Sequence, residues 1–407
     1  MNCRHCDNTL EHVFLNLGFA PPSNAYLNAA DLQAPEKYFP LKLFVCDQCW
    51  LVQTEDYSIS EELFTKDYAY FSSTSTTWLE HAKSYVDTIT ARLGLGADSF
   101  VIEVASNDGY LLKNFVVRGV PCLGIEPTES TAAVAEATGI PVEREFFGQD
   151  LAIKLAQSDR CADLIIGNNV YAHVPNINDF TAGMQTALKP GGTITLEFPH
   201  LLSLIRLNQF DTAYHEHYSY LSLQSVKAIF ARAKLRVCDV EKLTTHGGSL
   251  RIYGCHSNDV RVDSPAVARL LAEEVAAGLQ RLETYKCFQQ EADNVKNRLL
   301  SFLVEAKLAG KSVAAYGAAA KGNTLMNYAG VKPDLLPFVC DAATSKQGKF
   351  MPGSHIPILA PTELRKHKPD FVLILPWNIT AEVITSNEFV RAWGGKFVVA
   401  VPTLQIF

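Results

Sequence analysis

The stretch YHEHYSY, residues 214–220, gathers two histidines, one glutamate and three tyrosines within seven positions. The whole chain of 407 residues contains only 11 histidines, so titratable side chains are concentrated here. Histidine changes its protonation state near neutral pH, and a nearby carboxylate can orient it and stabilise its charged form. A tyrosine hydroxyl can donate to a developing oxyanion. The pattern favours general acid–base chemistry, such as removal of a proton next to a carbonyl group.

The residue types alone do not decide which histidine of this stretch is the base. In an extended or turn conformation Tyr214 and Glu216 would share one side, and His215 and His217 the other. A second interpretation is a turn whose histidines satisfy buried polar groups. The choice depends on what the rest of the chain brings to this turn.

Two C-x-x-C pairs near the N-terminus have the spacing of metal ligands. The cysteines, four of ten in the chain, are Cys3, Cys6, Cys46 and Cys49. Both thiolates of such a pair can reach one tetrahedral Zn²⁺, and turn formers in GFAPPSN (18–24) let the chain double back between the pairs. Four sulfur ligands close the coordination shell, so we expect a structural zinc with neither His5 nor His12 as a ligand. Redox-active or buried free thiols are the alternative.

A strand, a loop, a helix and a second strand follow in the order of a nucleotide-binding unit. FVIEV (100–104) and PCLGIE (121–126) are predicted as buried strands on either side of the loop ASNDGYLL and a helical stretch. Glu126 ends the second strand, where a carboxylate can bind two ribose hydroxyls. The loop lacks the G-x-G-x-x-G dinucleotide fingerprint, of which only Gly109 is present.

The acidic character of this loop favours a positively charged ligand. Glu103 and Asp108 would attract the amino and sulfonium groups of S-adenosylmethionine (SAM). ADLIIGNNV (162–170) is predicted as the next strand, and KPGGTITLEFP (189–199) as a turn followed by a strand. We therefore expect a SAM-binding methyltransferase domain with a Rossmann-like fold. The expected cofactor-binding residues are Glu103, Ala105, Asn107, Gly109, Glu126 and Asn168.

A second open parallel sheet is predicted for the C-terminal part of the chain. Apolar residues at three- and four-residue steps indicate a helical connector over residues 265–308. Beyond it, the strand Ser312–Tyr316 precedes a small-residue loop (317–322) and a helix after Asn323. Lys321 and the loop amides could hold a phosphate at the helix N-terminus, and a tight packing turn is the alternative.

Composition and charge limit the class of protein. With 48% hydrophobic and 19% charged residues the chain has a globular composition. A net charge of −7 argues against binding nucleic acid through phosphate neutralisation. No apolar run approaches the length of a membrane span, and MNCRHCDNTL lacks the apolar region of a secretory signal. We expect a cytoplasmic enzyme with a small-molecule substrate, no membrane association and no evident protein partner.

The chain should fold as an α/β protein of three domains, because it is too long for one ordinary core. We expect a zinc-binding domain over residues 1–70 and a SAM-binding methyltransferase domain over residues 71–256. Residues 257–407 are expected to form the helical connector and a C-terminal Rossmann-like domain.

These motifs together resemble the bacterial SAM-dependent C-methyltransferases that act on nucleotide-linked 4-keto-deoxysugars, including dTDP-linked sugars. The motifs that carry the resemblance are CRHC with CDQC, EVASNDGYLL, NNVYAHVPN, LEFPH, DTAYHEHYSYLS, THGGSLRIYG and AAYGAAAKGNTLMN. The resemblance covers nearly the whole chain and implies the same three domains. It departs at Ala105, where the family loop usually has glycine, and we expect alanine to be tolerated there through a negative φ.

The resemblance implies roles for individual residues. Tyr214, Glu216 and His217 fall on the family's catalytic positions, with His217 as the base. Asn169, near the end of the predicted strand 162–170, and His173, just after it, are implied to lie near the substrate. Including Lys321 as the contact for a substrate diphosphate, the expected substrate-binding residues are Tyr68, Asn169, His173 and Lys321. Packing at a domain junction is the alternative for Tyr68 and for the neighbouring Tyr70, and His246 could also approach the site.

The sequence therefore predicts methyl transfer from SAM to a ring carbon, C3 beside a C4 ketone, through an enolate. One alternative is a SAM-dependent sugar O-methyltransferase, which needs only a base. The other is a non-catalytic, zinc-bearing protein that binds SAM or a nucleotide.

Overall fold

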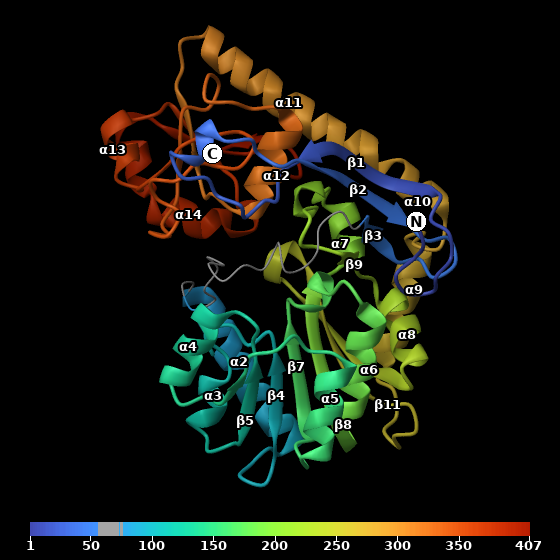
Figure 1. Cartoon of the computed structure of the whole chain (residues 1–407). Helices are drawn as coiled ribbons and strands as arrows, with labels where there is room; N and C mark the ends of the chain where they lie inside the picture. The colour runs from blue at the N-terminus through green and yellow to red at the C-terminus, as the bar shows by residue number, and fades with distance from the viewer. Residues whose placement is uncertain (56–72, 74–75) are drawn as a thin grey trace.

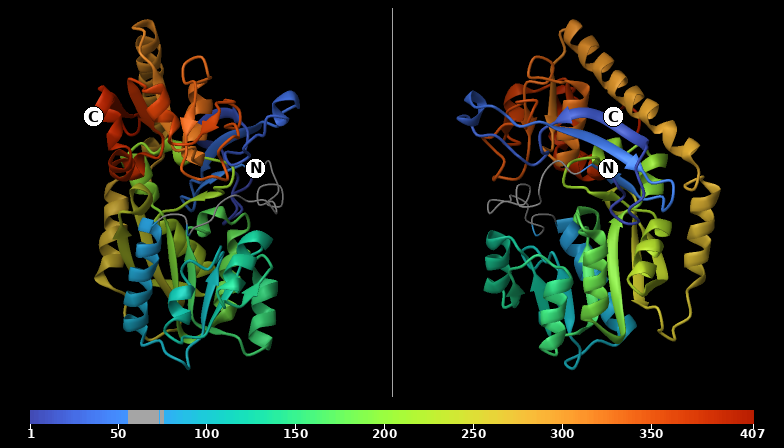
Figure 2. Two further views of the ribbon diagram at one scale, coloured as in Figure 1. Left: turned by 90° about the vertical axis from the view of Figure 1, so that its left-hand side faces the viewer. Right: turned by 45° about the vertical axis from the view of Figure 1, so that its right-hand side comes forward.

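The computed structural model describes residues 1–55, 73 and 76–407, so Tyr68 and Tyr70 lie outside the described residues. Figure 1 shows the seven-stranded sheet in the lower half, with the N-terminal strands and the C-terminal α/β unit above it. The predicted helical connector is present and runs along one side of the molecule, as the right-hand view of Figure 2 shows. It consists of α9 (Pro265–Ala276), α10 (Leu282–Lys286) and α11 (Phe288–Leu308).

The N-terminal sheet contains four antiparallel strands in the order β1-β2-β3-β9. They are β1 (His12–Ala20), β2 (Phe39–Val45), β3 (Val52–Thr54) and β9 (Ser219–Tyr220). Strand β2 alternates as a half-buried strand should, with Leu41, Leu43 and Val45 inside. The last strand, β9, comes from the YHEHYSY stretch far along the chain. The N-terminal sheet therefore reaches directly into the segment that carries the acid–base residues.

The central sheet has the strand order β10-β11-β8-β7-β4-β5-β6. Its strands are β4 (Val101–Val104), β5 (Cys122–Ile125), β6 (Val142–Glu143), β7 (Ala162–Asn168), β8 (Leu188–Pro199), β10 (Leu235–Leu243) and β11 (Ser249–His256). Only β11 runs antiparallel to its neighbours. The chain winds outward from β4 to β6 and returns to β7 on the other side of β4. Ligands of open α/β sheets bind at such a switch point, beyond the carboxyl ends of the strands.

Helices cover both faces of this sheet, because successive strand residues point to opposite faces. Val101 and Leu164 pack in one apolar cluster, and Ile102 and Ile165 pack in another. The first cluster includes α2 (Thr76–Leu93), α3 (Lys113–Val116) and α4 (Glu129–Ala137). The second includes α5 (Gln149–Gln157), α6 (Ile177–Ala187) and α8 (Leu223–Arg232). This is the predicted Rossmann-like α/β domain.

The C-terminal sheet has the order β14-β13-β12-β15-β16-β17 and is parallel except for β17. Its strands are β12 (Val313–Tyr316), β13 (Val339–Cys340), β14 (Ile358–Leu359), β15 (Phe371–Ile374), β16 (Lys396–Val399) and β17 (Gln405–Ile406). Its helices are α12 (Ala320–Ala329), α13 (Glu363–His367) and α14 (Thr380–Ser386). The second open parallel sheet is confirmed. Helix α12 begins at Ala320, earlier than expected, which places Lys321 in its first turn.

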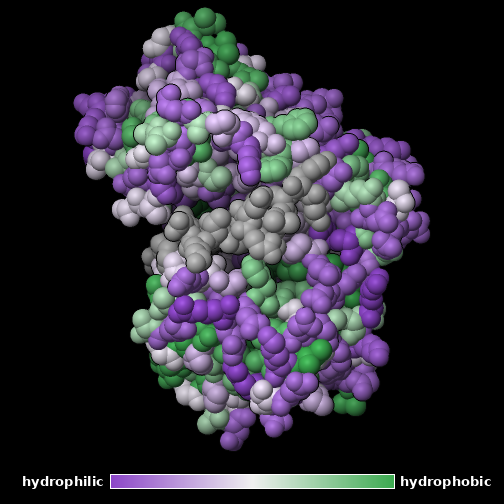
Figure 3. All heavy atoms as spheres, viewed as in Figure 1, coloured by the Kyte–Doolittle hydropathy of each residue, from purple (hydrophilic) through white to green (hydrophobic). Residues whose placement is uncertain are grey.

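One apolar core joins the N-terminal sheet, α11, α12 and the C-terminal sheet. These parts pack around the YHEHYSY stretch from above, while the central sheet lies below it (Figure 1). The face seen in Figure 3 is mostly polar, with apolar residues in small scattered groups. Among the residues that the structure describes, no helix is long and apolar enough to cross a membrane.

Candidate active site

Tyr214 and His217 face each other across a tight turn. The backbone N–H of His217 donates to the carbonyl oxygen of Tyr214 at 2.9 Å, which closes the turn. The hydroxyl of Tyr214 lies 2.7 Å from Nε2 of His217, and the two ring centroids are 3.9 Å apart. The turn therefore pairs the tyrosine with a histidine, where simple alternation would have paired it with Glu216.

The tautomer of His217 follows from its second contact. Its Nδ1 lies 3.0 Å from the carbonyl oxygen of Thr212. A carbonyl can only accept, so Nδ1 carries the proton and Nε2 accepts from the hydroxyl of Tyr214. Burial, and then the nearby imidazole of His173, lower the pKa of His217 well below its ordinary value. The ring is neutral at pH 7 and presents a lone pair at Nε2.

Glu216 faces the N-terminal loop. Its Oε1 accepts from Nδ2 of Asn24 at 3.1 Å, while its buried Oε2 has no hydrogen-bond partner within the described part of the chain. Burial raises the pKa of Glu216 to about 7. The ring of His217 is oriented by the carbonyl of Thr212 and not by this carboxylate. Asn24 is a contact that sequence analysis missed, and nothing in the GFAPPSN turn singled it out.

His215 is separated from His217 by its packing. Its Nε2 donates to the carbonyl oxygen of Pro40 at 3.2 Å, and its ring lies 6.0 Å from that of Phe39 in β2. His215 thus attaches the turn to the N-terminal sheet, while the ring of His217 packs against those of Tyr214 and His173.

The loop after β7 supplies two of the expected substrate residues. Helix η3 (Tyr171–His173) brings His173 within 4.5 Å of His217, measured between ring centroids. Burial lowers the pKa of His173 to about 4. Nδ2 of Asn169 donates to Nε2 of His246 at 3.3 Å. The structure therefore brings Asn169, His173 and His246 together with the Tyr214–His217 pair.

The C-terminal unit contributes a cation. Nζ of Lys321 donates to Oδ1 of Asn378 at 2.7 Å and lies 4.3 Å from the ring centroid of Trp377. Nε1 of Trp377 donates to Oδ2 of Asp211 at 2.7 Å. Burial raises the pKa of Asp211 to about 6, against the opposing effect of the Lys321 charge, and burial lowers the pKa of Lys321 to about 8. Sequence analysis missed Asp211 and Trp377, although Asp211 opens the quoted stretch DTAYHEHYSYLS.

Carboxylates gather at the carboxyl ends of β4 and β5. Oε2 and Oε1 of Glu126 accept from the backbone amides of Asn107 and Thr128, both at 2.9 Å. Glu103 is fully buried, and burial together with the charges of Asp108 and Glu126 raises its pKa well above the ordinary value. Such a concentration of like charge is stabilised by a cationic ligand.

Buried polar atoms without hydrogen-bond partners mark the same place. Those at the ends of β4 and β7 are Oε2 of Glu103, Oγ of Ser106, Oδ1 of Asp108 and both side-chain polar atoms of Asn168. They lie at or just beyond the carboxyl ends of β4 and β7, on the two sides of the switch point. Buried polar groups are normally paired, so these atoms indicate a ligand. The amino and sulfonium groups of SAM fit this acidic, unpaired set.

The backbone of the loop corrects one expectation. Ala105 has φ +57° and not the negative value that its tolerance was expected to require. An L-residue in this left-handed conformation costs about 1–2 kcal/mol, which explains why glycine suits the position. Gly109 has φ +76°, and a Cβ there would lie 2.4 Å from Cδ1 of Ile140, so glycine is required at this close approach.

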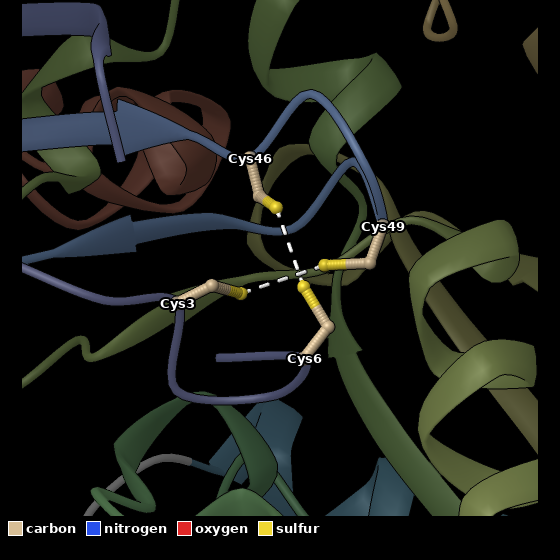
Figure 4. Close-up of side chains that lie close together, drawn as sticks. All are labelled: Cys3, Cys6, Cys46 and Cys49. Carbon is tan, nitrogen blue, oxygen red and sulfur yellow. Dashed lines mark hydrogen bonds between the residues drawn. The ribbon is translucent and has the colours of Figure 1, made fainter. Parts of the chain in front are cut away.

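The four cysteines converge as predicted (Figure 4). Sγ of Cys3 lies 3.5 Å from that of Cys49, and the same distance separates Cys6 and Cys46. All four sulfurs lie within 4.8 Å of one another. A tetrahedral site with Zn–S bonds of about 2.3 Å requires sulfurs about 3.8 Å apart, so the cluster fits Zn²⁺. His5 contacts Asn178 instead, through Nδ1 at 2.9 Å.

Three family models match successive parts of the chain. "Putative zinc binding domain" covers residues 3–64, "Methyltransferase domain" covers 78–240, and "C-methyltransferase C-terminal domain" covers 244–402. C-methyltransferase NovU of Streptomyces niveus is 34% identical over 406 residues, which span 99% of this chain and 96% of NovU.

Solved structures are similar to part of the chain. A SAM-dependent methyltransferase of Clostridium acetobutylicum ATCC 824 is 10% identical, with a TM-score of 0.36, over 44% of this chain and 92% of its own. Magnesium protoporphyrin IX methyltransferase of Synechocystis PCC 6803 is 14% identical, with a TM-score of 0.35, over 44% of this chain and 83% of its own.

Proposed function

We propose a substrate and a reaction for this chain from the premise that it belongs to the SAM-dependent C-methyltransferases. The substrate would be a nucleotide-linked 4-keto-deoxysugar, and the methyl group would be added at C3, beside the C4 ketone. The observation that carries the proposal is the neutral His217, whose Nε2 lone pair is buried at the meeting point of the three parts of the chain.

His217 is the base in this proposal. A proton next to a ketone is acidic enough to be removed by a positioned imidazole, provided that the enolate oxygen is stabilised. The C3 proton passes to Nε2, and the hydroxyl of Tyr214 transfers its hydrogen bond from Nε2 to the oxygen of the ketone. The Nδ1–H bond to Thr212 then stabilises the imidazolium that forms.

The other polar groups would hold the substrate. His173 lies beside His217, Asn169 contacts His246, and both would contact the sugar. Glu216, with one unpaired oxygen and a pKa of about 7, would accept from a sugar hydroxyl in its ionised form. Lys321, in the first turn of α12, would face the diphosphate, because a cation and helix N-terminal amides together favour anions. Tyr68 remains an expected substrate contact outside the described residues.

SAM, when bound, supplies the methyl group. Glu103, Asn107, Gly109, Glu126 and Asn168 would hold it at the ends of β4, β5 and β7, with Ala105 in the same loop. Glu126 would bind the ribose hydroxyls, and the remaining carboxylates would face the positive charges.

A proton-exchange experiment tests this function. A dTDP-4-keto-6-deoxysugar is supplied in D₂O with S-adenosylhomocysteine in place of SAM, and the C3 proton is followed by NMR. We expect exchange by the wild type and by His215→Ala, the matched neighbour whose ring packs on β2, and loss of exchange in His217→Ala. Enzyme-dependent exchange that survives in His217→Ala would reject His217 as the base. A product methylated on oxygen would reject the enolate itself.

A further inference from the structure

The strand that leaves the cysteine cluster runs directly to the catalytic turn. Two backbone hydrogen bonds close the turn between Cys46 and Cys49. The N–H of Trp50 donates to the carbonyl oxygen of Cys46 at 2.9 Å, and the N–H of Cys46 donates to the carbonyl oxygen of Leu51 at 3.0 Å. Strand β3 follows at once and pairs with β9, Val52 beside Tyr220. Only one residue lies between His217 and the start of β9.

Thr54, at the end of β3, holds the backbone of His217. Its hydroxyl donates to the carbonyl oxygen of His217 at 3.1 Å, and its N–H donates to that of Tyr218 at 3.2 Å. Thr54 and His217 are 3% and 7% exposed. A buried carbonyl needs a hydrogen-bond donor. For the carbonyl of His217 that donor is a residue of the N-terminal sheet, Thr54.

The other cysteine pair, Cys3 and Cys6, contacts the same strand. Nε2 of Gln53 donates to Sγ of Cys3 at 3.2 Å, and the N–H of Arg4 donates to Oε1 of Gln53 at 2.9 Å. Nη2 of Arg4 donates to the carbonyl of Thr54 at 2.9 Å. The Cys3–Cys6 turn therefore holds Gln53 and Thr54, the two residues of β3 nearest the catalytic turn, while the Cys46–Cys49 turn leads directly into this strand.

The Cys3–Cys6 turn also holds the chain that carries His173. Nη1 of Arg4 donates to the carbonyl of Pro175 at 2.8 Å, and Nδ2 of Asn178 donates to the carbonyl of His5 at 2.9 Å. A third hydrogen bond joins this chain to the catalytic turn, because the N–H of Tyr218 donates to the carbonyl oxygen of Ala172 at 2.8 Å. The two histidine-bearing segments are thus fastened to each other and to the cysteine cluster.

We propose that the four-cysteine centre positions His217 for proton abstraction through Thr54, which acts as a positioning residue. The proposal rests on the proposed function for the role of His217. The ring of His217 is fixed by Thr212 and Tyr214 relative to its own turn, whereas Thr54 fixes that turn relative to the rest of the site. A catalytic group displaced by about 1 Å loses roughly a hundredfold in rate, so a bond this close to the base has a measurable effect on turnover.

Three substitutions test the role of the Thr54 hydroxyl. Thr54→Val keeps the shape and removes the donor, Thr54→Ser keeps the donor, and Thr284→Val removes a hydroxyl that donates to the carbonyl of Gly278 in the helical connector. We expect Thr54→Val to lower kcat by about tenfold to a hundredfold with an unchanged KM for SAM and unchanged zinc content. Thr54→Ser should restore the rate, and Thr284→Val should leave it unchanged.

The ¹⁵N signals of the His217 ring provide a readout that needs no substrate. They report the tautomer and the contacts of the ring, with assignment by His217→Gln. We expect them to shift in Thr54→Val and to return in Thr54→Ser. Unchanged His217 signals and a kcat within twofold of wild type in Thr54→Val would overturn the proposal.

Metal removal from the wild type gives a second test that does not depend on the folding of a variant. A chelator is added while the secondary structure is monitored by circular dichroism. We expect the His217 signals to change, whereas those of His256, whose Nε2 donates to the carbonyl of Leu188 in the central sheet, stay in place. An unchanged His217 ring after metal release would also overturn the proposal. Failure of the proposed function would appear separately, as absent C3 exchange in the wild type.

Discussion

Trp377 and Asp211 join the C-terminal unit to the segment that leads into the Tyr214–His217 turn through one hydrogen bond of 2.7 Å. The indole sits between opposite charges, because Lys321 lies over its ring while Asp211 accepts from its N–H. Gly247 packs against the same ring so closely that a Cβ would lie 2.5 Å from it. These contacts of Trp377 therefore fix the position of the C-terminal unit relative to Asp211 and Gly247.

Trp377→Phe should destabilise this junction. Removal of the donor leaves a buried carboxylate oxygen unpaired, which costs about 1–3 kcal/mol, and it should raise the KM for the proposed sugar substrate. Urea denaturation measures the loss, and a double-mutant cycle with Asp211→Asn should give a coupling of at least about 1 kcal/mol. Trp393→Phe is the matched control, since its indole donates to the backbone carbonyl of Pro369. Equal effects of both substitutions would contradict the prediction.

Glu216 should make the protein less stable as the pH rises. Its pKa in the folded protein is about 7, above the ordinary 4.5, so the folded state binds more protons than the unfolded state between these values. The free energy of unfolding therefore falls with increasing pH across this window, by about 3 kcal/mol for 2.5 pKa units.

Glu216→Gln cannot titrate and removes this dependence. Denaturation at pH 5 and pH 8 should show the variant gaining about 2–3 kcal/mol relative to wild type at the higher pH. A difference between variant and wild type that is the same at both pH values would show that Glu216 is not held in its neutral form.

Ala105→Gly should stabilise the protein. Glycine adopts φ +57° without the steric cost that alanine bears, and the expected gain is about 1 kcal/mol. The matched control is Ala137→Gly at the exposed last position of α4, where glycine should instead cost up to about 1 kcal/mol. Thermal denaturation measures both. SAM affinity of Ala105→Gly should not fall, and a loss of stability would mean that the left-handed turn is not populated.

Glu126→Gln should weaken SAM binding by about tenfold or more, because hydrogen bonds to a charged acceptor contribute about 1.5–3 kcal/mol. The variant also places an amide N–H against the backbone N–H of Asn107 or Thr128, which already donate to this side chain. Isothermal titration with SAM is the measurement, and Glu129→Gln in the first turn of α4 is the control. Unchanged affinity in Glu126→Gln would move the ribose contact to another residue.

Patterns local in sequence predicted much of this structure. The two C-x-x-C pairs specify one metal site because each pair already spans two ligand positions, and the acid at the end of the second strand, Glu126, lies at the carboxyl end of β5 as expected, while its ribose contact stays a prediction. The strand and helix periods of residues 100–170 and 265–308 predicted the observed elements for the same reason. The turn expected at residues 189–192 was wrong, because these residues belong to β8 (Leu188–Pro199). Local spacing also singled out Asn169 and His173 as candidates for the site, and the structure places both after β7, with His173 beside His217.

Contacts between distant segments could not be predicted in this way. Asn24 reaches Glu216 across 192 positions, and Trp377 reaches Asp211 across 166. Neither residue stands in a spacing that encodes its partner. The negative φ expected for Ala105 was wrong, because the residue type alone does not determine the backbone angle that its loop requires.

Strand β9 has a consequence for how the chain is made. Thr54 and His217 are 163 positions apart, so during translation β3 has no partner on one edge until most of the methyltransferase domain has left the ribosome. An unpaired edge invites pairing with other chains. The N-terminal unit therefore completes its sheet late, and a separately expressed fragment that stops at residue 70 would keep that edge open.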